Sequence, residues 1–320
     1  MKNEIMKNRK KINVPVLIGP TASGKTSLAI KIALAAGAEI ISCDSRQIYK
    51  KMDIGTAKPS VEELAMVKHH LIDIIDPSES FSYADFSRLA VEKIDKIIAS
   101  GKVPFVVGGT GFYLDGLVNG VSMIPELDES GARIMRDELE LKETAELVSI
   151  LRKLDLASAS RIKFNDRQRL IRAIIVSRLS GAPFSSFKDV RQKKDNYNYL
   201  IFGLTKPRQL LYNDINSRVD DMFNRGLVDE VSNLLKNGYT ILMPAMKTIG
   251  YQECVEYLQG RVSSIEMSEL IKQHTRNYAK RQITYFKKFS SARWLEAAGT
   301  AGSKERNFEA ILLEIKKIID

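Results

Sequence analysis

The sequence predicts an α/β protein whose core is a parallel sheet, with a second, helical domain inserted into the chain. Short apolar runs alternate with helix-like segments over the first hundred residues, which is typical of sheets covered by helices on both faces. The pattern is helical from about residue 124 to about residue 180, and an apolar run returns at 199–204. We therefore expect a core of residues 1–120 together with 196–320, and an all-helical insert over residues 121–195.

Each element of the core has its own signal in the sequence. The apolar run at 14–18 precedes a glycine-containing turn, and a segment rich in Ala, Leu, Ile and Lys follows it. At 83–99 the apolar residues recur at the spacing of one helix face. The chain after residue 207 is expected to be mostly helical. In chain order, the predicted strands are 14–18, 38–42, 102–107 and 199–204, and the first predicted helices are 27–36 and 83–99.

The composition excludes several classes of protein. With 320 residues, 44% of them hydrophobic and 28% charged, the chain can bury a sizeable core and is neither disordered nor collagen-like. It contains no run of about eighteen apolar residues, so no membrane span is expected. The basic segment 1–11 lacks the apolar stretch of a signal peptide. Two cysteines and three scattered histidines predict neither a disulfide framework nor a zinc site, so we expect a cytoplasmic protein.

Positive charge is concentrated in two segments. The formal net charge is +10, from 49 Lys and Arg against 39 Asp and Glu. Residues 161–178 hold six basic residues against one acid, and residues 271–294 hold seven Lys and Arg without an acid. A solvated basic surface is the simpler interpretation. Clusters of this kind are also typical of proteins that bind a polyanion such as nucleic acid, and aromatic residues lie among the charges of the second cluster.

A glycine-rich loop after the first predicted strand matches the phosphate-binding pattern G-x-x-x-x-G-K-[ST] and predicts a P-loop NTPase-like core. Its backbone N–H groups can turn toward phosphate oxygens at the start of a helix, where the helix dipole favours negative charge. The lysine would neutralise a phosphate, and the Thr26 hydroxyl would ligate Mg²⁺. Kinases, ATPases and transferases of pyrophosphorylated substrates all use such loops, so ATP and diphosphate remain alternative ligands. The loop comprises Gly19, Pro20, Thr21, Ala22, Ser23, Gly24, Lys25 and Thr26.

Polar residues follow the second and third predicted strands at the same edge of the sheet, where ligands bind in open α/β folds. Asp44 is expected to hold magnesium through water or to act as a general base, with capping of a turn as the alternative. Arg46 and Gln47 offer polar recognition groups nearby. The turn Gly108-Gly109-Thr110-Gly111 brings Thr110 to the same crevice, and close packing of a helix is the alternative role of its glycines.

Eight segments, in order, resemble those of bacterial tRNA dimethylallyltransferases, the isopentenylpyrophosphate transferase family. They are GPTASGKT, DSRQIYKKMDIGTAKP, HHLIDIIDP, VGGTGFYLDGL, NDRQRLIRAI, MFNRGLVDEV, AMKTIGYQE and TRNYAKRQITYFKK. The resemblance spans about residues 12 to 295. It is much more specific than the phosphate loop alone, which unrelated NTPases share.

Enzymes of this family transfer a dimethylallyl group from dimethylallyl diphosphate to N6 of the adenosine just 3′ of the anticodon in tRNA. The resemblance therefore implies that the loop binds the diphosphate with Mg²⁺ and does not split a nucleoside triphosphate. It implies that Asp44 accepts the proton of the N6 amine, and that Lys25 and Arg218 stabilise the leaving diphosphate. Thr110 joins the implied catalytic set. From the residues alone, Arg218 would be interpreted as a solvent-facing helix charge.

The resemblance also implies which residues contact tRNA. The target base must leave the anticodon stack, and contacts in the pocket and along the backbone must offset that cost. Arg169 and Arg172 share one helix face, and Leu170 and Ile174 turn elsewhere to pack. The implied tRNA-binding residues are Asp44, Ser45, Arg46, Gln47, Thr110, Gln168, Arg169, Leu170, Ile171, Arg172, Lys247, Thr248, Ile249, Gly250, Tyr251, Gln252, Lys280, Arg281 and Lys288.

The implied enzyme is a monomer without a membrane partner, whose helical insert grips tRNA while the diphosphate and the base enter one channel from opposite sides. Two residues depart from the family pattern: Tyr285 stands where Trp is frequent, and Gln252 where Lys is frequent, which removes a positive charge. A small-molecule kinase or a transferase acting on free adenylate would keep the loop, but neither explains the basic clusters. An RNA-binding NTPase is the non-transferase alternative.

Overall fold

The structure is a computed structural model that describes residues 11–125, 127–187, 191–193, 197–297 and 302–319. The chain divides into two compact units, one of residues 1–118 with 195–320 and one of residues 119–194. The second unit is the counterpart of the predicted insert. Within the described ranges, no helix is both long enough and apolar enough to cross a bilayer.

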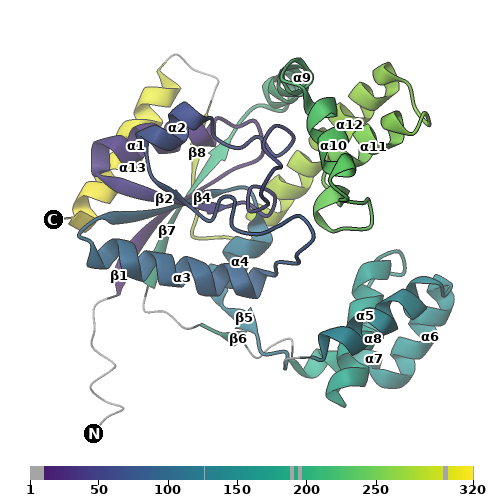
Figure 1. Ribbon diagram of the computed structural model, residues 1–320. Coiled ribbons are helices and arrows are strands. Elements are labelled where there is room, and N and C mark those ends of the chain that lie inside the picture. Colours follow the sequence, from purple (N-terminus) through teal and green to yellow (C-terminus); the bar gives the residue numbers. More distant parts are fainter. Residues whose placement is uncertain (1–10, 126, 188–190, 194–196, 298–301, 320) are drawn as a thin grey trace, which may run out of the picture. The chain divides into compact units, whose positions relative to one another are not determined.

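The first unit is built on a six-stranded sheet in which every neighbouring pair is parallel (Figure 1). The predicted α/β class with a parallel core is therefore confirmed. The strand order is β3-β2-β4-β1-β7-β8. The strands are β1 (Ile12–Ile18), β2 (Ala38–Cys43), β3 (His69–His70), β4 (Val103–Gly108), β7 (Tyr197–Thr205) and β8 (Arg293–Glu296). The four central strands match the predicted runs, whereas β8 lies in a part of the chain that was predicted to be mostly helical.

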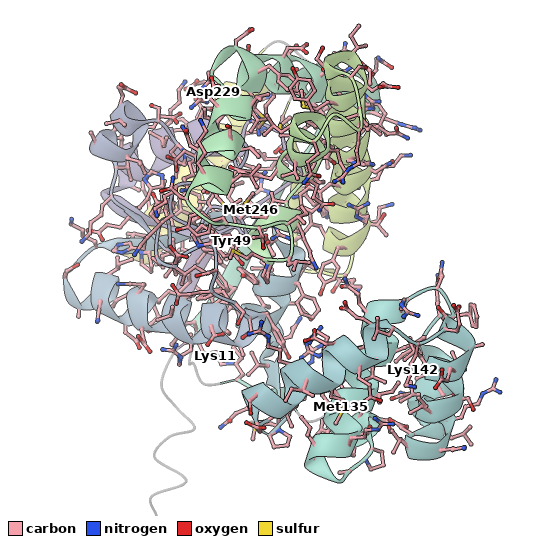
Figure 2. All side chains as sticks on the ribbon, turned by 45° about the vertical axis from the view of Figure 1, so that its right-hand side comes forward. Lys11, Tyr49, Met135, Lys142, Asp229 and Met246 are labelled. Carbon is pink, nitrogen blue, oxygen red and sulfur yellow. The ribbon has the colours of Figure 1, made fainter. Side chains whose placement is uncertain are left out.

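Helices cover both faces of this sheet. One buried core joins the sheet to α3, α4 and the end of α12, and a second joins it to α1 and α13. A third core joins the segment after β2 to α9, α10, α11 and α12; Tyr49 and Met246, labelled in Figure 2, belong to it. The helices of this unit are α1 (Lys25–Ala36), α2 (Val61–Met66), α3 (Tyr83–Ala99), α4 (Gly111–Asn119), α9 (Arg208–Asn224), α10 (Leu227–Lys236), η3 (Ala245–Lys247), α11 (Tyr251–Leu258), α12 (Ser264–Phe286) and α13 (Ser303–Ile319).

Local sequence explains where several of these helices begin and end. The side chains of Ser82 and Ser263 accept hydrogen bonds from the backbone N–H of the third residue of α3 and of α12. The side chains of these third residues, Asp85 and Glu266, accept in return from the backbone N–H of the two serines. Gly37 ends α1 in the left-handed conformation, with φ of 59°, which favours glycine.

The second unit is a helical cluster with its own buried core. Its helices are α5 (Glu129–Glu140), α6 (Thr144–Leu154), α7 (Leu156–Arg161), α8 (Arg167–Ser180) and η2 (Phe184–Phe187). Two short strands, β5 (Val121–Ser122) and β6 (Arg191–Gln192), pair antiparallel in the same unit. The prediction of an all-helical insert is therefore wrong in this detail, because strands of two residues are too short to produce an alternating pattern.

Candidate active site

The carboxyl edge of the sheet borders a cavity of about 470 Å³. Ile18, Cys43 and Gly108 lie in register on neighbouring parallel strands, so the residues that follow them leave the sheet side by side. The phosphate loop, the turn at Asp44 and the turn at Gly109 therefore meet at one space. Of the predicted site residues, those that line the cavity are Thr21, Lys25, Thr26, Asp44, Arg46, Gln47, Arg218, Lys247, Thr248, Ile249, Gln252 and Arg281.

The phosphate loop connects β1 directly to α1, as the sequence predicts. Gly24 has φ of 83°, a left-handed conformation that glycine adopts without strain, and α1 begins at the next residue. The carbonyl of Pro20 accepts from the backbone N–H of Ser23 and from Nζ of Lys25, at 3.3 and 2.7 Å. Ala22 and Ser23 are buried. The loop thus wraps around its own lysine, which is held at the cavity wall.

Two cations face the cavity beside this loop. Arg218, on α9, donates from Nη1 to the Thr21 hydroxyl at 3.3 Å. Burial and the neighbouring Arg218 guanidinium lower the pKa of Lys25 to about 7, although Asp44 acts in the opposite direction. Burial also lowers the pKa of Arg218. Two partly desolvated positive groups close together form a site that an anion would stabilise, because an anion would offset both the desolvation and the mutual repulsion.

The turn after β2 is held in place by Thr110. Asp44 accepts from the backbone N–H of Arg46 through Oδ1 at 2.8 Å, and the N–H of Ser45 donates to Oγ1 of Thr110 at 2.9 Å. The N–H of Thr110 donates in turn to the carbonyl of Cys43 at 3.1 Å. Its hydroxyl is bonded to the backbone next to Asp44, so Thr110 positions this turn, and the catalytic role that the resemblance implies for it stays a prediction.

Gln47 is engaged within the protein as well. Its Nε2 donates to the carbonyl of Ala57 at 3.1 Å, and its Oε1 accepts from the Ser42 hydroxyl at 3.0 Å. Both ends of the amide therefore tie β2 to the loop that follows. Nη1 of Arg46 donates to the carbonyl of Pro244 at 3.3 Å. Both side chains line the cavity, and their contacts define its wall.

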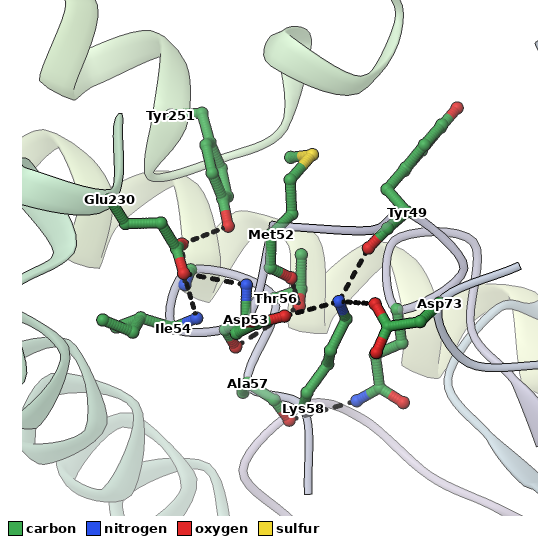
Figure 3. A network of polar contacts seen from close by, with 12 residues as sticks. Tyr49, Met52, Asp53, Ile54, Thr56, Ala57, Lys58, Asp73, Glu230 and Tyr251 are labelled. Carbon is green, nitrogen blue, oxygen red and sulfur yellow. Dashed lines mark hydrogen bonds and ion pairs between the residues drawn. The ribbon is translucent and has the colours of Figure 1, made fainter. Parts of the chain in front are cut away.

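A single carboxylate holds the loop at residues 53–55, as Figure 3 shows. Oε2 of Glu230, on α10, accepts from the backbone N–H groups of Asp53 and Ile54, both at 2.8 Å. Its Oε1 accepts from Gly55 at 3.2 Å and from the Tyr251 hydroxyl at 2.5 Å. A Cβ on Gly55 would lie 2.4 Å from the Tyr251 ring, so only glycine fits there. Gly55 lines the cavity, so this network sets part of its shape.

Lys58 anchors the same loop from its other end. Its side chain is almost fully buried, and Nζ donates to the Tyr49 carbonyl at 2.7 Å and to Asp53 at 2.6 Å, as well as to Asp73 (Figure 3). A buried ammonium that is matched by two carboxylates and a carbonyl is fully hydrogen-bonded. The loop between Asp44 and α2, which lines part of the cavity, is therefore held in place by these hydrogen bonds and ion pairs.

Glu230→Gln is expected to lower the free energy of unfolding by about 2 kcal/mol, because three loop N–H groups and a tyrosine hydroxyl lose a charged acceptor. The amide nitrogen of Gln would also face a donor. The matched control is Asp229→Asn, the exposed neighbour in the first turn of α10, for which we expect a loss below about 1 kcal/mol. Chemical denaturation of both variants measures the difference, and equal losses would refute the anchoring role.

The structure corrects part of the predicted tRNA-binding segment at residues 247–252. Lys247 and Gln252 are exposed, but Tyr251 is fully buried and its hydroxyl is bonded to Glu230. Burial and the adjacent carboxylate raise the pKa of Tyr251 well above its usual value. Thr248 and Gly250 are also buried. Tyr251 therefore supports the cavity wall from inside, and its side chain is not placed to contact RNA.

The arginine pair of α8 lies on the surface of the second unit. Gln168, Arg169 and Arg172 are exposed, and Arg169 forms a 3.4 Å ion pair with Asp166. Leu170 and Ile174 are fully buried, which confirms the predicted division of the helix. Ile171 is also buried, so neither it nor Leu170 is placed to present a side chain to RNA, and the prediction is corrected for these two residues.

The cations of α12 and the residues after it divide into two groups. Lys272 pairs with Asp220 at 2.7 Å and Arg276 donates to Asn216 at 2.8 Å, so these two hold α12 against α9. The second group is exposed and contains the predicted tRNA contacts Lys280, Arg281 and Lys288.

Four residues at the site were not predicted from the sequence. Glu230 and Lys58 hold the wall, and Tyr278 lines the cavity, where burial and the nearby Asp44 raise its pKa to about 12. Gln282, also on the wall, connects two turns at the edge of the sheet. In the sequence they are marked only by lying in segments that resemble the family, DIGTAKP, MFNRGLVDEV and TRNYAKRQITYFKK, and this resemblance gives no side-chain direction.

The chain is similar to known proteins over most of its length. The sequence model of the IPPT family, described as IPP transferase, matches residues 47–289. The chain is 45% identical over 290 residues to tRNA dimethylallyltransferase 2 of Geotalea uraniireducens, a match that covers 89% of this chain and 93% of the relative. It is 43% identical over 283 residues to tRNA dimethylallyltransferase of Thermotoga maritima, covering 88% and 92%.

Solved structures give the same result. A tRNA delta(2)-isopentenylpyrophosphate transferase from Staphylococcus epidermidis aligns with a TM-score of 0.69 and 38% identity, over 96% of this chain and 99% of that one. A eukaryotic dimethylallyltransferase acting on tRNA aligns with a TM-score of 0.82 and 27% identity, over 97% and 80%. The family match includes Arg218 and all of α12. By its sequence and its fold, this chain belongs to the IPP transferase family.

Proposed function

We propose that this chain transfers the dimethylallyl group of dimethylallyl diphosphate to N6 of the adenosine that follows the anticodon in tRNA, releasing diphosphate. The observation that carries the proposal is that one cavity brings together Lys25, Arg218 and Asp44. The first two are cations suited to a diphosphate, and the third is a carboxylate suited to accept a proton. The proposal includes that the enzyme acts as a monomer.

The proposed step is a displacement at the allylic carbon. The lone pair of N6 forms the new C–N bond while the bond from that carbon to the diphosphate oxygen breaks. Asp44 accepts the proton that N6 loses, and Lys25 and Arg218 stabilise the negative charge on the departing diphosphate. Because the exocyclic amine loses its proton only as the C–N bond forms, the position of the carboxylate matters more than its strength as a base.

The residues present fit a magnesium ion that arrives with the diphosphate. Among the described residues, no three His, Cys, Asp or Glu side chains gather as a metal site. Mg²⁺ commonly keeps several waters and needs few protein ligands when it binds substrate phosphates. Thr26 lines the cavity, and its hydroxyl would be one such ligand. When bound, the ion would neutralise charge on the diphosphate.

RNA binding is assigned to exposed cations on each unit. Replacement of Arg169, Arg172, Lys280 or Lys288 by Ala is expected to flatten the plot of log affinity against log salt concentration, by about 0.7 per single-strand phosphate contact and about 0.9 per duplex contact. Each contact releases condensed counterions, whereas a solvated charge does not. The control is Lys236→Ala, an exposed lysine in the last turn of α10. Titration of an anticodon stem-loop at several salt concentrations measures the slopes, and unchanged slopes in all four variants would reject these contacts.

The function is tested by incubating the protein with an anticodon stem-loop RNA, dimethylallyl diphosphate and MgCl₂, and then weighing the RNA. We expect a gain of one dimethylallyl group in place of one hydrogen. A stem-loop with guanosine at the target position is expected to gain nothing. Transfer to free adenylate but not to the stem-loop would assign the chain to the nucleotide-modifying class. Steady ATP hydrolysis without prenyl transfer would assign it to the RNA-binding NTPases.

A further inference from the structure

Gln282 joins two turns that border the cavity. Its Oε1 accepts from the backbone N–H of Thr21 in the phosphate loop at 2.9 Å, and its Nε2 donates to the carbonyl of Gly109 at 2.8 Å. The residue is 6% exposed and lines the cavity. Neither contact belongs to a helix or a strand pair. This one side chain therefore supplies hydrogen-bond partners to a backbone N–H in one turn and to a backbone carbonyl in the other.

The helix holds this amide in a fixed place. Ala279 and Phe286, three residues before and four residues after Gln282, are fully buried on the same helix face. Ala279 packs with Ala22 of the phosphate loop, and Phe286 packs into the core beneath the sheet. A Cβ on Gly109 would lie 2.5 Å from Nε2, so any larger residue at this turn would displace the amide.

The contacts of Gln282 continue to the proposed base. Gly109 is followed by Thr110, whose hydroxyl accepts from the N–H of Ser45, the residue next to Asp44. On the other side, the Thr21 hydroxyl accepts from Arg218. Hydrogen bonds and short stretches of backbone therefore connect Arg218 with Asp44 through Gln282.

We propose that Gln282 is a positioning residue for group transfer: its amide fixes the spacing between the phosphate loop and the Asp44 turn, and thereby between the allylic carbon and the amine. This inference rests on the proposed function. The residue type follows from the geometry, because one planar amide accepts and donates at the same time, whereas a carboxylate only accepts and an ammonium only donates. Because the amide takes the Thr21 N–H, that group is not available to the diphosphate.

Gln282→Met keeps the length of the side chain and removes both hydrogen bonds. We expect kcat to fall about a hundredfold, because a displacement of about 1 Å between reacting groups has this cost, while the KM values for diphosphate and RNA change little. A raised KM with an unchanged kcat would overturn the proposal, since it would make Gln282 a binding residue. A parent-like kcat would overturn it as well.

Gln282→Glu distinguishes a hydrogen-bonding role from a merely structural one, because its effect on the rate should depend on pH. An ionised carboxylate accepts from Thr21 but repels the Gly109 carbonyl, whereas a protonated carboxyl accepts and donates as the amide does. Burial beside a carbonyl raises the pKa of such a carboxyl. The ratio of the variant rate to the parent rate should therefore rise as the pH falls, and at low pH Gln282→Glu should be faster than Gln282→Met. A ratio that does not change with pH would contradict the hydrogen-bonding role.

Two further variants complete the experiment. Gln273→Glu, at an exposed position of the same helix, controls for added charge and should give a flat ratio. If Gln282→Met fails to fold, as thermal unfolding would reveal, Gly109→Ala displaces the amide while Gln282 is retained, and the same loss in kcat is expected. Absence of transfer by the parent protein would refute the proposed function. Transfer by the parent with parent-like variants would refute only this inference.

Discussion

Asp44→Asn is expected to lower the single-turnover rate of prenyl transfer about a hundred- to ten-thousand-fold, the usual contribution of a positioned general base. The substitution is chosen because the Asn oxygen can keep the acceptor position of Oδ1 for the Arg46 N–H, so the turn should stay intact. The amide cannot take up the proton that N6 loses. Single-turnover measurement with both substrates saturating isolates this step from binding.

The folding and RNA affinity of Asp44→Asn should remain near those of the parent protein. Asp229→Asn, the same chemical change at an exposed site outside the cavity, should transfer at the parent rate. If Asp44→Asn retained a near-normal rate, the proton would have to leave by another route, to water or to another group of the protein. The assignment of Asp44 as the base would then be withdrawn, while the phosphate loop would keep its role.

The central strands could be predicted from the sequence because burial leaves a continuous signal. The strands β1 and β4 are almost wholly apolar, since helices cover both faces of the sheet. The edge strands do not show this signal: β3 is the pair His69–His70, and β8 (Arg293–Glu296) is half charged. An edge strand is identified by the neighbour with which it pairs. The partner of β8 is β7, which lies about ninety residues earlier in the chain.

The site divides in a similar way. The phosphate loop was predictable because its mechanism requires a fixed spacing within eight residues, and Asp44 because it follows a buried strand. Gln282 contacts Thr21 across 261 residues of sequence, so only the fold brings them together. Tyr251 illustrates the opposite error: a segment that matches a family contact region contains residues that face inward, and only the packing distinguishes them.

Lys25→Met is expected to weaken the binding of dimethylallyl diphosphate by about 2 to 5 kcal/mol, or about 30- to 4000-fold, because the diphosphate loses a partly desolvated charged partner. The affinity for the stem-loop should change far less, because we propose that the RNA contacts are distributed over exposed cations on α8 and α12. Calorimetric titration with the diphosphate alone, and separately with the RNA, measures both affinities. Loss of RNA binding in a folded variant would contradict this division of roles.

The lowered pKa of Lys25 gives the same experiment a second readout. In the ligand-free protein this pKa is about 7, and a bound anion raises it toward the ordinary value of 10.5. Below pH 7 the lysine is already charged and the affinity is at its full value. Above pH 7 binding must take up a proton, so the affinity falls as the pH rises, by up to about tenfold per unit. The diphosphate titrates too, and Lys25→Met reports that contribution by itself. The difference between parent and variant should therefore diminish above pH 7, and calorimetry across buffers should show more proton uptake by the parent than by the variant. A difference that is constant from pH 6 to pH 9 would show that Lys25 is already charged before the diphosphate binds.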